Sequence, residues 1–218
     1  MITIVSTKIL SKKHISNFSK NNIKVLNYGF IKIKSINFSS NLIYKNIIFT
    51  SKNAVKSVLQ LNKISIKTPV FCVGKKTKNL LEKNNFNVVL YKDYAKDLGV
   101  EIVKNHKNNS FTFFCGNLRK ETLPNKLKEH NITFNEIKVY ETLLKPHIIK
   151  EPANAILFFS PSAVESYLIL NTIKNEVCFC IGKTTAQVLE NKKIKNIIIA
   201  KKPSVENVIN KVINYYNN

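Results

Sequence analysis

Arginine is almost absent from this strongly basic chain. Of its 35 Lys and Arg residues only Arg119 is an arginine, and Asp and Glu together number 13, so the formal net charge is +22. Direct reading of DNA bases depends largely on the bidentate guanidinium group, so this composition argues against sequence-specific nucleic-acid recognition. Lys, Asn and Ile are abundant along the whole chain, as in proteins from AT-rich genomes, and solvated lysines explain most of the charge. The field would still concentrate an acidic small-molecule substrate.

Long hydrophobic runs are also missing. The mean hydropathy is −0.11, and no apolar run approaches the roughly 20 residues that a membrane-spanning helix needs. The apolar stretch near the start, Ile2–Val5, is too short for the hydrophobic region of a secretory signal. We therefore expect a cytoplasmic protein that does not associate with a membrane.

Cysteines are few and suit a protein core rather than a metal site. Cys72, Cys115, Cys178 and Cys180 each lie in an apolar segment. The Cys178-x-Cys180 pair has no neighbouring His or second Cys pair to complete a zinc site. We expect four buried, reduced thiols and no metal.

The familiar signatures of nucleotide binding and hydrolysis are missing too. The chain has neither Gly-x-Gly-x-x-Gly nor the complete phosphate-binding loop Gly-x4-Gly-Lys-Ser/Thr. Its four histidines are scattered, with no acid or nucleophile at a spacing that suggests a catalytic pair. The sequence therefore argues against classical hydrolase chemistry.

The sequence instead contains one pattern twice. Residues 47–57 match residues 156–166 at an offset of 109, and residues 71–77 match residues 179–185 at an offset of 108. The start of the chain likewise runs in register with the segment that begins near residue 110. Agreement over several blocks in order indicates a duplicated unit of about half the chain.

Each copy alternates short β-branched and aromatic runs with helical patterns of 10–15 residues. Lys52–Leu61, for example, has apolar residues at helical spacing behind the strand Ile47–Phe49, and a further helix is expected from Gly116-Asn117 through Glu129. This alternation predicts an α/β fold with a doubly wound parallel sheet in each copy. Whether the chain crosses between the copies after Phe30–Ile36 and Val139–Lys145 is left open by the pattern.

Small polar residues follow the predicted strands, where ligands bind in open α/β sheets. Each such residue alone suits a helix N-cap. As a set, with three of the five glycines placed among them, they predict a site in which helix N-termini, hydroxyls and lysines hold a multiply charged anion. The five turns are Thr50-Ser51-Lys52-Asn53, Gly74-Lys75-Lys76-Thr77, Cys115-Gly116-Asn117, Ser160-Pro161-Ser162 and Gly182-Lys183-Thr184-Thr185.

The same residues carry a family resemblance, spread over the chain in a fixed order. Five motifs resemble those of the uroporphyrinogen-III synthases, from the first strand-end turn to the last. They are Phe49-Thr50-Ser51-x-x-Ala54-Val55, Cys115-Gly116-Asn117-x-Arg119-x-Glu121-x-Leu123-Pro124, Val139-Tyr140-x-Thr142, Phe158-Phe159-Ser160-Pro161-Ser162-Ala163 and Ile181-Gly182-x-Thr184-Thr185-Ala186.

This resemblance implies two similar α/β domains with a cleft between them. The first domain would be discontinuous, from residues 1–31 plus 146–218, and the second would span 40–138. Segments 32–39 and 139–145 would form a two-stranded linker ladder.

The resemblance also implies a cofactor-free enzyme that makes the ring precursor of haem. Its substrate would be the polycarboxylate hydroxymethylbilane, which loses water and closes to uroporphyrinogen III with ring D inverted. Tyr140 would assist departure of the hydroxyl group. The turn residues Thr50, Ser51, Lys52, Asn53, Gly74, Thr77, Gly116, Asn117, Ser160, Pro161, Ser162, Gly182, Thr184 and Thr185 would bind the substrate.

A monomer is expected, in transient contact with the preceding enzyme of the pathway. The rival hypothesis from another class is a non-enzymatic, two-lobed protein that binds anions or nucleic acid without needing Tyr140. A second rival is a doubly wound enzyme that uses a nucleotide or sugar phosphate, against which the missing phosphate loops count.

Overall fold

The computed structural model describes residues 1–39, 43–61 and 64–217. The chain divides into two compact units: unit 1 combines Met1–Lys32 with Leu143–Asn218, and unit 2 is Ile33–Thr142. The chain passes from one unit to the other twice, within strands β3 (Ile31–Ser35) and β8 (Phe134–Leu144). The predicted boundary at residue 40 lies outside the described residues.

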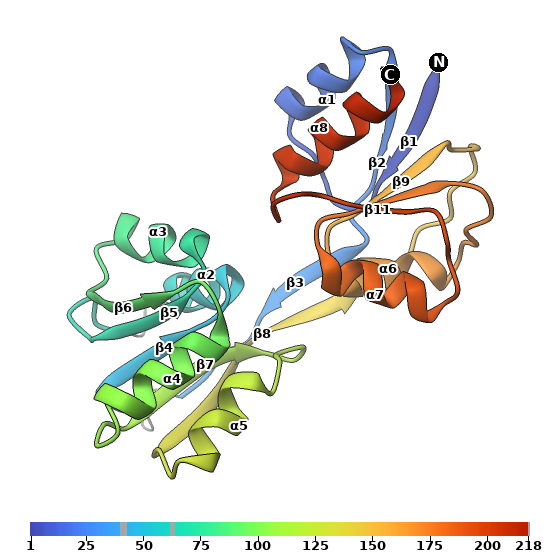
Figure 1. The fold of residues 1–218 in the computed structure, drawn as a ribbon. Helices are drawn as coiled ribbons and strands as arrows, with labels where there is room; N and C mark the ends of the chain where they lie inside the picture. Colours follow the sequence, from blue (N-terminus) through green and yellow to red (C-terminus); the bar gives the residue numbers. More distant parts are fainter. Residues whose placement is uncertain (40–42, 62–63, 218) are drawn as a thin grey trace. The chain divides into compact units, whose positions relative to one another are not determined.

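Unit 1 contains a five-stranded parallel sheet in the order β11-β10-β9-β1-β2 (Figure 1). Helices α1 and α8 pack on one face of this sheet, and helices α6 and α7 pack on the other. The central strands β9 and β10 are apolar along their whole length, as expected for strands that are covered on both faces. The elements are β1 (Ile2–Ser6), α1 (Lys12–Ser19), β2 (Ile23–Asn27), β9 (Ala155–Phe158), α6 (Pro161–Leu168), β10 (Val177–Cys180), α7 (Lys183–Asn191), β11 (Ile197–Ile199) and α8 (Val205–Tyr216).

Unit 2 contains a six-stranded sheet in the order β3-β8-β7-β4-β5-β6, in which the five strands from β8 to β6 are parallel. Helices α2 and α3 cover one face, and helices α4 and α5 cover the other. The remaining elements are β4 (Asn46–Phe49), α2 (Lys52–Leu61), β5 (Val70–Val73), α3 (Lys75–Lys83), β6 (Val88–Lys92), α4 (Ala95–Asn105), β7 (Phe111–Gly116) and α5 (Thr122–Glu129).

The two sheets follow one plan. Strands β9, β10 and β1 of unit 1 correspond to β4, β5 and β7 of unit 2 in the sequence repeat, and they occupy the same places in the strand order. In unit 2 these strands come from one continuous segment. In unit 1 they come from both ends of the chain, with β1 between β9 and β2.

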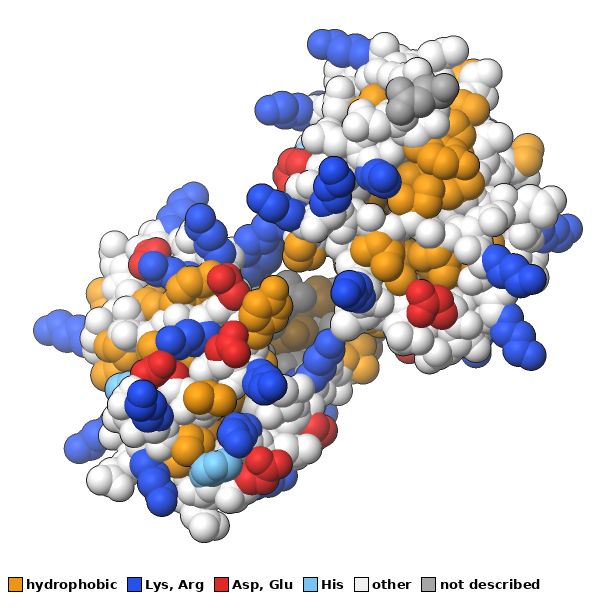
Figure 2. All heavy atoms as spheres, viewed as in Figure 1, with side chains coloured by type: hydrophobic (Ala, Val, Ile, Leu, Met, Phe, Trp, Pro, Cys, Tyr) orange, Lys and Arg blue, Asp and Glu red, His pale blue; other side chains and the backbone are white. Residues whose placement is uncertain are grey.

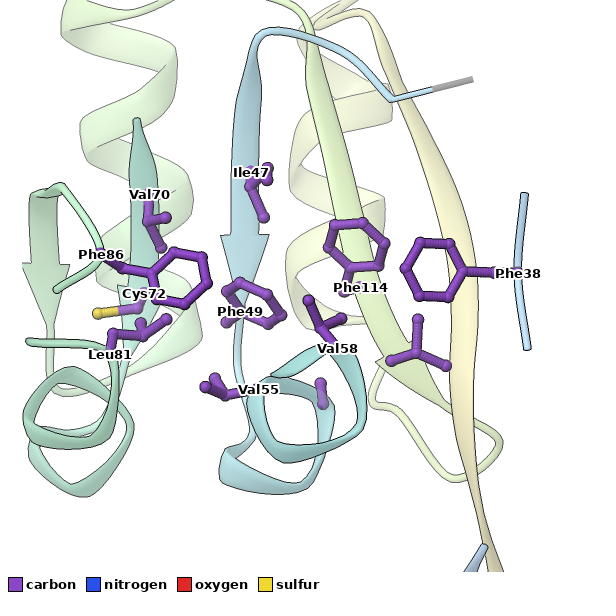
Figure 3. Packing of buried hydrophobic residues seen from close by; sticks show 12 residues of the cluster. Phe38, Ile47, Phe49, Val55, Val58, Val70, Cys72, Leu81, Phe86 and Phe114 are labelled. Atoms are coloured by element: carbon purple, nitrogen blue, oxygen red, sulfur yellow. The ribbon is translucent and has the colours of Figure 1, made fainter. Parts of the chain in front are cut away.

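Stacked aromatic rings hold the strands of unit 2 in place. Phe114 of β7 stacks on Phe49 of β4 with ring centroids 5.5 Å apart, and Phe38 contacts the Phe114 ring from the other side at 5.2 Å (Figure 3). Burial of each such ring contributes about 1.5–3 kcal/mol to stability. Because Phe114 is anchored on this side of the sheet, the end of β7 at Gly116 lies at a defined point on the sheet edge.

One helix starts later than its pattern predicts. Helix α5 begins at Thr122 and not directly after Asn117. The intervening residues form a turn in which the Arg119 N–H donates to the Gly116 carbonyl at 3.3 Å. The side chains of this turn bond to β8, as described below, and those bonds hold it outside the helix.

Candidate functional site

Four strands of unit 2 bring candidate residues to a single edge of its sheet. Strand β4 ends directly before Thr50 and Ser51, β5 ends before Gly74, and β7 ends at Gly116. Strand β8 passes beside Gly116 at Tyr140. Because these strands are parallel, their carboxyl ends meet at the same edge.

Tyr140 occupies the middle of this edge. Its hydroxyl group donates a hydrogen bond to Ser51 Oγ at 3.2 Å, and Ser51 Oγ also accepts from the Asn53 N–H at 3.1 Å. Its ring lies directly against Gly116, since an ideal Cβ added to Gly116 would be only 2.3 Å from Tyr140 Cζ. The side chain is half-buried, so its phenol is in reach of a ligand while its ring packs against the core of unit 2.

A cavity of about 270 Å³ opens beside this tyrosine. Thr50, Ser51 and Tyr140 supply hydroxyl groups to its lining, while Arg119 and Lys120 supply positive charge. The other lining residues are largely apolar. A pocket with this mixture suits a ligand that combines an apolar ring with carboxylates.

The turn after β5 depends on a glycine. Gly74 has φ +87°, a conformation that other residues rarely adopt, and its carbonyl accepts the N–H groups of Thr77 and Lys78 at 2.9 and 3.1 Å. Thr77 is buried, with only 4% of its surface exposed. The backbone of this turn thus reaches the sheet edge, whereas the Thr77 hydroxyl lies below the surface.

The turn after β7 is tied to β8 through two side chains. Asn117 bonds to both backbone groups of Thr142, as acceptor from the N–H at 2.8 Å and as donor to the carbonyl at 3.3 Å. Arg119 pairs with Glu121 and, at 2.6 Å, with Glu136 of β8. The hydrogen bond to Glu121, together with Glu136, raises the pKa of Arg119 further above its usual value.

In unit 1 the corresponding turn after β9 is a well-formed helix start. Ser160 caps α6 by accepting the Ala163 N–H at 3.2 Å, and Pro161 lies in the first turn. Ser160 Oγ and Ser162 Oγ are 3.1 Å apart, and Ser162 is 7% exposed. The cap function that the sequence predicts for Ser160 is therefore present.

The turn after β10 differs in backbone shape from its counterpart in unit 2. Gly182 has φ −177°, which is ordinary extended backbone, and an added Cβ would meet nothing within 4 Å. Its carbonyl accepts the N–H groups of Thr185 and Ala186 at 3.0 and 3.2 Å. Thr184 is exposed and Thr185 is buried, so the two adjacent threonines are not equivalent.

The structure adds two polar residues that lie outside the sequence motifs. Ser6 ends β1 and Thr7 follows it at the carboxyl edge of unit 1, and both are buried. The Thr7 hydroxyl donates to the Leu157 carbonyl at 2.7 Å, and the Ser6 hydroxyl donates to the Lys8 carbonyl at 2.6 Å. The repeat pairs them with Cys115 and Gly116, a signal that would have identified them.

All four thiols are buried and free, as the sequence predicts for core cysteines. Burial raises the pKa of Cys72 to about 11 and that of Cys178 and Cys180 to about 12. The pKa of Cys115, which lines the cavity beside Tyr140, is also raised by burial. A neutral thiol is a poor nucleophile, so these cysteines act as small apolar residues.

In the described part of the chain, no group of three or more His, Cys, Asp or Glu side chains could hold a metal ion. No helix among residues 1–39, 43–61 and 64–217 has the length and apolar character to cross a membrane. On the face drawn in Figure 2, Lys and Arg side chains are scattered over both units.

Comparison with known proteins gives a family match over most of the chain. The sequence model described as uroporphyrinogen-III synthase HemD matches residues 16–210. No sequence among the curated proteins is a match.

Solved structures share the fold. The uroporphyrinogen-III synthetase of Helicobacter pylori 26695 aligns with a TM-score of 0.77 and 24% identity, over 99% of this chain and 100% of that chain. A mutant uroporphyrinogen III synthase from the extremely thermophilic bacterium Thermus thermophilus aligns with a TM-score of 0.68 and 12% identity, over 100% of this chain and 98% of that chain. These similarities confirm the predicted α/β class with parallel sheets.

Proposed function

Because the chain belongs to the uroporphyrinogen-III synthase HemD family, we propose that it closes hydroxymethylbilane to uroporphyrinogen III at the carboxyl edge of its sheets. It is an enzyme of tetrapyrrole biosynthesis that acts on a small molecule, a hydro-lyase that cyclises its substrate. What we propose beyond this is the identity of the open-chain substrate and the residues that bind and activate it.

The chemistry of the edge suits a polycarboxylate tetrapyrrole. Hydroxyl groups of Thr50, Ser51 and Tyr140 line a largely apolar cavity, whose lining also includes Lys120 and the ion-paired Arg119. Helix N-termini beside this edge favour negative charge, and the net charge of +22 attracts an anion from a distance. Pyrrole rings would occupy the apolar part, and acetate or propionate groups would bind the hydroxyls and amides.

The proposed reaction needs little covalent participation by the protein. The C–O bond of the hydroxymethyl group on ring A breaks, and one proton leaves with hydroxide as water. The cationic carbon attacks the α position of ring D that already carries the bridge to ring C. The bond from ring D to that bridge then breaks, and the bridge carbon bonds to the unsubstituted α position of ring D, so that the ring is inverted. Loss of one proton from ring D then restores the pyrrole, so atoms and charge balance. Holding the two ends together contributes several kcal/mol.

Tyr140 is the residue that we assign to departure of the hydroxyl group. Its phenol is directed to Ser51 Oγ at 3.2 Å, beside the cavity in which ring A would lie. In the complex the phenol would donate to the leaving oxygen instead, and the Ser51 hydroxyl would donate to the Tyr140 oxygen and keep it oriented. The position of this hydroxyl group, held between Ser51 and Gly116, is the single observation that carries the proposal.

The other turns would bind substrate carboxylates. We assign Thr50, Ser51, Lys52, Asn53 and the backbone at Gly74 and Gly116 in unit 2 to this role, with Thr77 shaping the turn that follows Gly74. In unit 1 the exposed Thr184 and the helix starts after Ser160 and Gly182 offer the same groups. The remaining residues of those two turns are Pro161, Ser162 and Thr185. The buried Ser162 would act through its backbone N–H group, whereas Thr185, whose N–H donates to the Gly182 carbonyl, would shape its turn.

We further propose the setting in which the chain works. The two units would correspond to the predicted domains, 1–31 plus 146–218 and 40–138. The enzyme would act as a monomer in the cytoplasm. Because the bilane also closes to the type I isomer without an enzyme, transient contact with the enzyme that makes it would limit the amount of bilane lost to that isomer.

The test is a coupled assay of the whole protein. Hydroxymethylbilane is generated in situ, the products are oxidised, and the uroporphyrin isomers are separated by chromatography. A dominant type III isomer is expected, because unaided closure yields type I. Type I alone, from folded protein, would refute the proposed function.

The Tyr140→Phe substitution tests the assignment of the phenol. We expect kcat for type III formation to fall by about 10²-fold or more, the usual contribution of a positioned acid, with the fold retained. Tyr216→Phe is the matched control, because it removes a hydroxyl group of α8 that donates to the Asn154 carbonyl at 3.3 Å. This variant should leave kcat unchanged. Full activity of folded Tyr140→Phe would reject the assignment.

A further inference from the structure

We infer that Asn117 is a positioning residue for Tyr140, and not a ligand of the substrate as its place in the motif suggests. The inference rests on the proposed function, because Tyr140 is the group that Asn117 would position. Four contacts join the turn after β7 to strand β8, all of them inside unit 2.

The first two contacts occupy both ends of the Asn117 carboxamide. Its Oδ1 accepts the Thr142 N–H at 2.8 Å, and its Nδ2 donates to the Thr142 carbonyl at 3.3 Å. Strand β7 ends at Gly116 while β8 continues to Leu144. The Asn117 side chain therefore takes the place of a backbone partner and extends the ladder past the end of β7. Most of the hydrogen-bonding capacity of the carboxamide is thus used within unit 2, and one N–H of its NH₂ group is left over.

The third contact is an ion pair on the same turn. Arg119 Nη2 lies 2.6 Å from Glu136 Oε2, and the Arg119 side chain is 21% exposed. Glu136 precedes Tyr140 on β8, and Thr142 follows it. The turn is thus fixed to β8 on both sides of the tyrosine.

The fourth contact, between the Tyr140 ring and Gly116, is the one that the other three maintain. The register between β7 and β8 shifts after Cys115, so that Cys115 pairs with Lys138 and Gly116 pairs with Tyr140. The extra residue in β8 is Val139, which is buried in the core of unit 2. This bulge sets the Tyr140 ring on Gly116, within the distance at which a Cβ would overlap it. A turn that moved away from β8 would remove the surface on which the ring lies.

The kinetic test uses Asn117→Ala in the whole protein. We expect kcat for type III formation to fall by about 10- to 100-fold, the effect of a displacement of about 1 Å in a catalytic group, with KM for the bilane unchanged. In the Tyr140→Phe background the same substitution should cause no further loss. A rise in KM at constant kcat, or a loss that multiplies with that of Tyr140→Phe, would make Asn117 a substrate ligand and overturn the inference.

A matched control separates positioning from general destabilisation. Asn171 in unit 1 also accepts a backbone N–H, that of Ile149 at 2.8 Å, and donates to a backbone carbonyl, that of His147 at 2.8 Å. Asn171→Ala should lower the melting temperature at least as much as Asn117→Ala while leaving kcat unchanged. An equal fall in kcat for both variants would count against positioning.

A second readout does not depend on turnover. With ¹³Cζ-labelled tyrosine the chain gives signals from its eight tyrosines, and Tyr140→Phe identifies that of Tyr140. Asn117→Ala should shift or broaden this signal, and Asn171→Ala should not. A Tyr140 signal that does not move in Asn117→Ala overturns the inference, even if the wild-type protein forms type III isomer. If the signal moves but the wild-type protein has no turnover, the positioning role stands and only the proposed function is refuted.

Discussion

The contact between Tyr140 and Gly116 shows how one missing side chain shapes the candidate site. A Cβ at position 116 would lie 2.3–2.8 Å from three atoms of the tyrosine ring, closer than real carbon contacts. Glycine is needed there because of this approach, not because of its backbone angles. The ring position therefore depends on a residue that makes no polar contact with it.

We predict that Gly116→Ala displaces the Tyr140 ring and lowers kcat for type III formation by about 10²-fold. The isomer assay measures the rate, and circular dichroism verifies the fold. Gly29→Ala serves as the control, since its new methyl group would meet only the flexible Ile9 side chain, at 3.3 Å. Unchanged activity of Gly116→Ala would show that the ring position is not critical.

At this scale the sequence identified the right positions but not their roles. Tyr140, Ser51 and Gly116 lie in motifs and could be selected as candidates. The engagement of Asn117 with Thr142 could not be predicted, because it depends on a bulge at Val139 that interrupts the alternation of β8. Likewise, no pattern distinguishes the buried Thr185 from the exposed Thr184.

Among the secondary-structure elements, the starts of α3 and α7 are a natural pair. Both follow a glycine at matching positions of the repeat, yet Gly74 has φ +87° and Gly182 has φ −177°. The same substitution at the two glycines therefore distinguishes the effect of backbone strain on stability from the effect of replacing a glycine.

We expect Gly74→Ala to lower the free energy of unfolding by about 1–3 kcal/mol, the cost of a non-glycine residue in a sparsely populated conformation. Gly182→Ala should change it little, because extended backbone accepts any residue and space is available. Urea unfolding monitored by circular dichroism compares the two. Equal losses would show that φ at Gly74 is not the cause.

The helices were more predictable from the sequence than the tertiary contacts that they and the strands make. Helix α2 spans Lys52–Leu61, the range that its periodicity predicts, because its apolar face packs on one sheet. The predicted start of α5 was wrong, since the bonds of the preceding turn to β8 are long-range and leave no local pattern. The crossing of the chain between the two copies was open for the same reason, as strand partners far apart in sequence are not encoded in periodicity.

In the molecule as a whole, the buried thiols link stability to alkaline pH. The folded pKa is about 11 for Cys72 and about 12 for Cys178 and Cys180, above the ordinary value of 9.0. The folded state thus retains protons that the unfolded state loses. The corresponding stability is complete below pH 9 and is lost as the pH rises through the folded values.

We predict that the free energy of unfolding falls between pH 9 and 12, with each of these thiols contributing at most about 1.4 kcal/mol per pH unit. Urea titrations at several pH values measure the slope under reducing conditions. In a Cys178→Ala/Cys180→Ala variant the free energy of unfolding should fall less steeply with pH, whatever the stability of that variant at neutral pH. Equal slopes would mean that other groups, such as lysines, cause the loss.

The position of β1 between β9 and β2 has a consequence during synthesis. Residues 33–142 leave the ribosome as one continuous segment, and unit 2 can fold as soon as they emerge. Strand β1 must wait for Ala155–Phe158 before its second edge is paired. At about 5–20 residues per second, β1 spends roughly ten seconds partly uncovered, so unit 1, although it contains β1, is completed after unit 2.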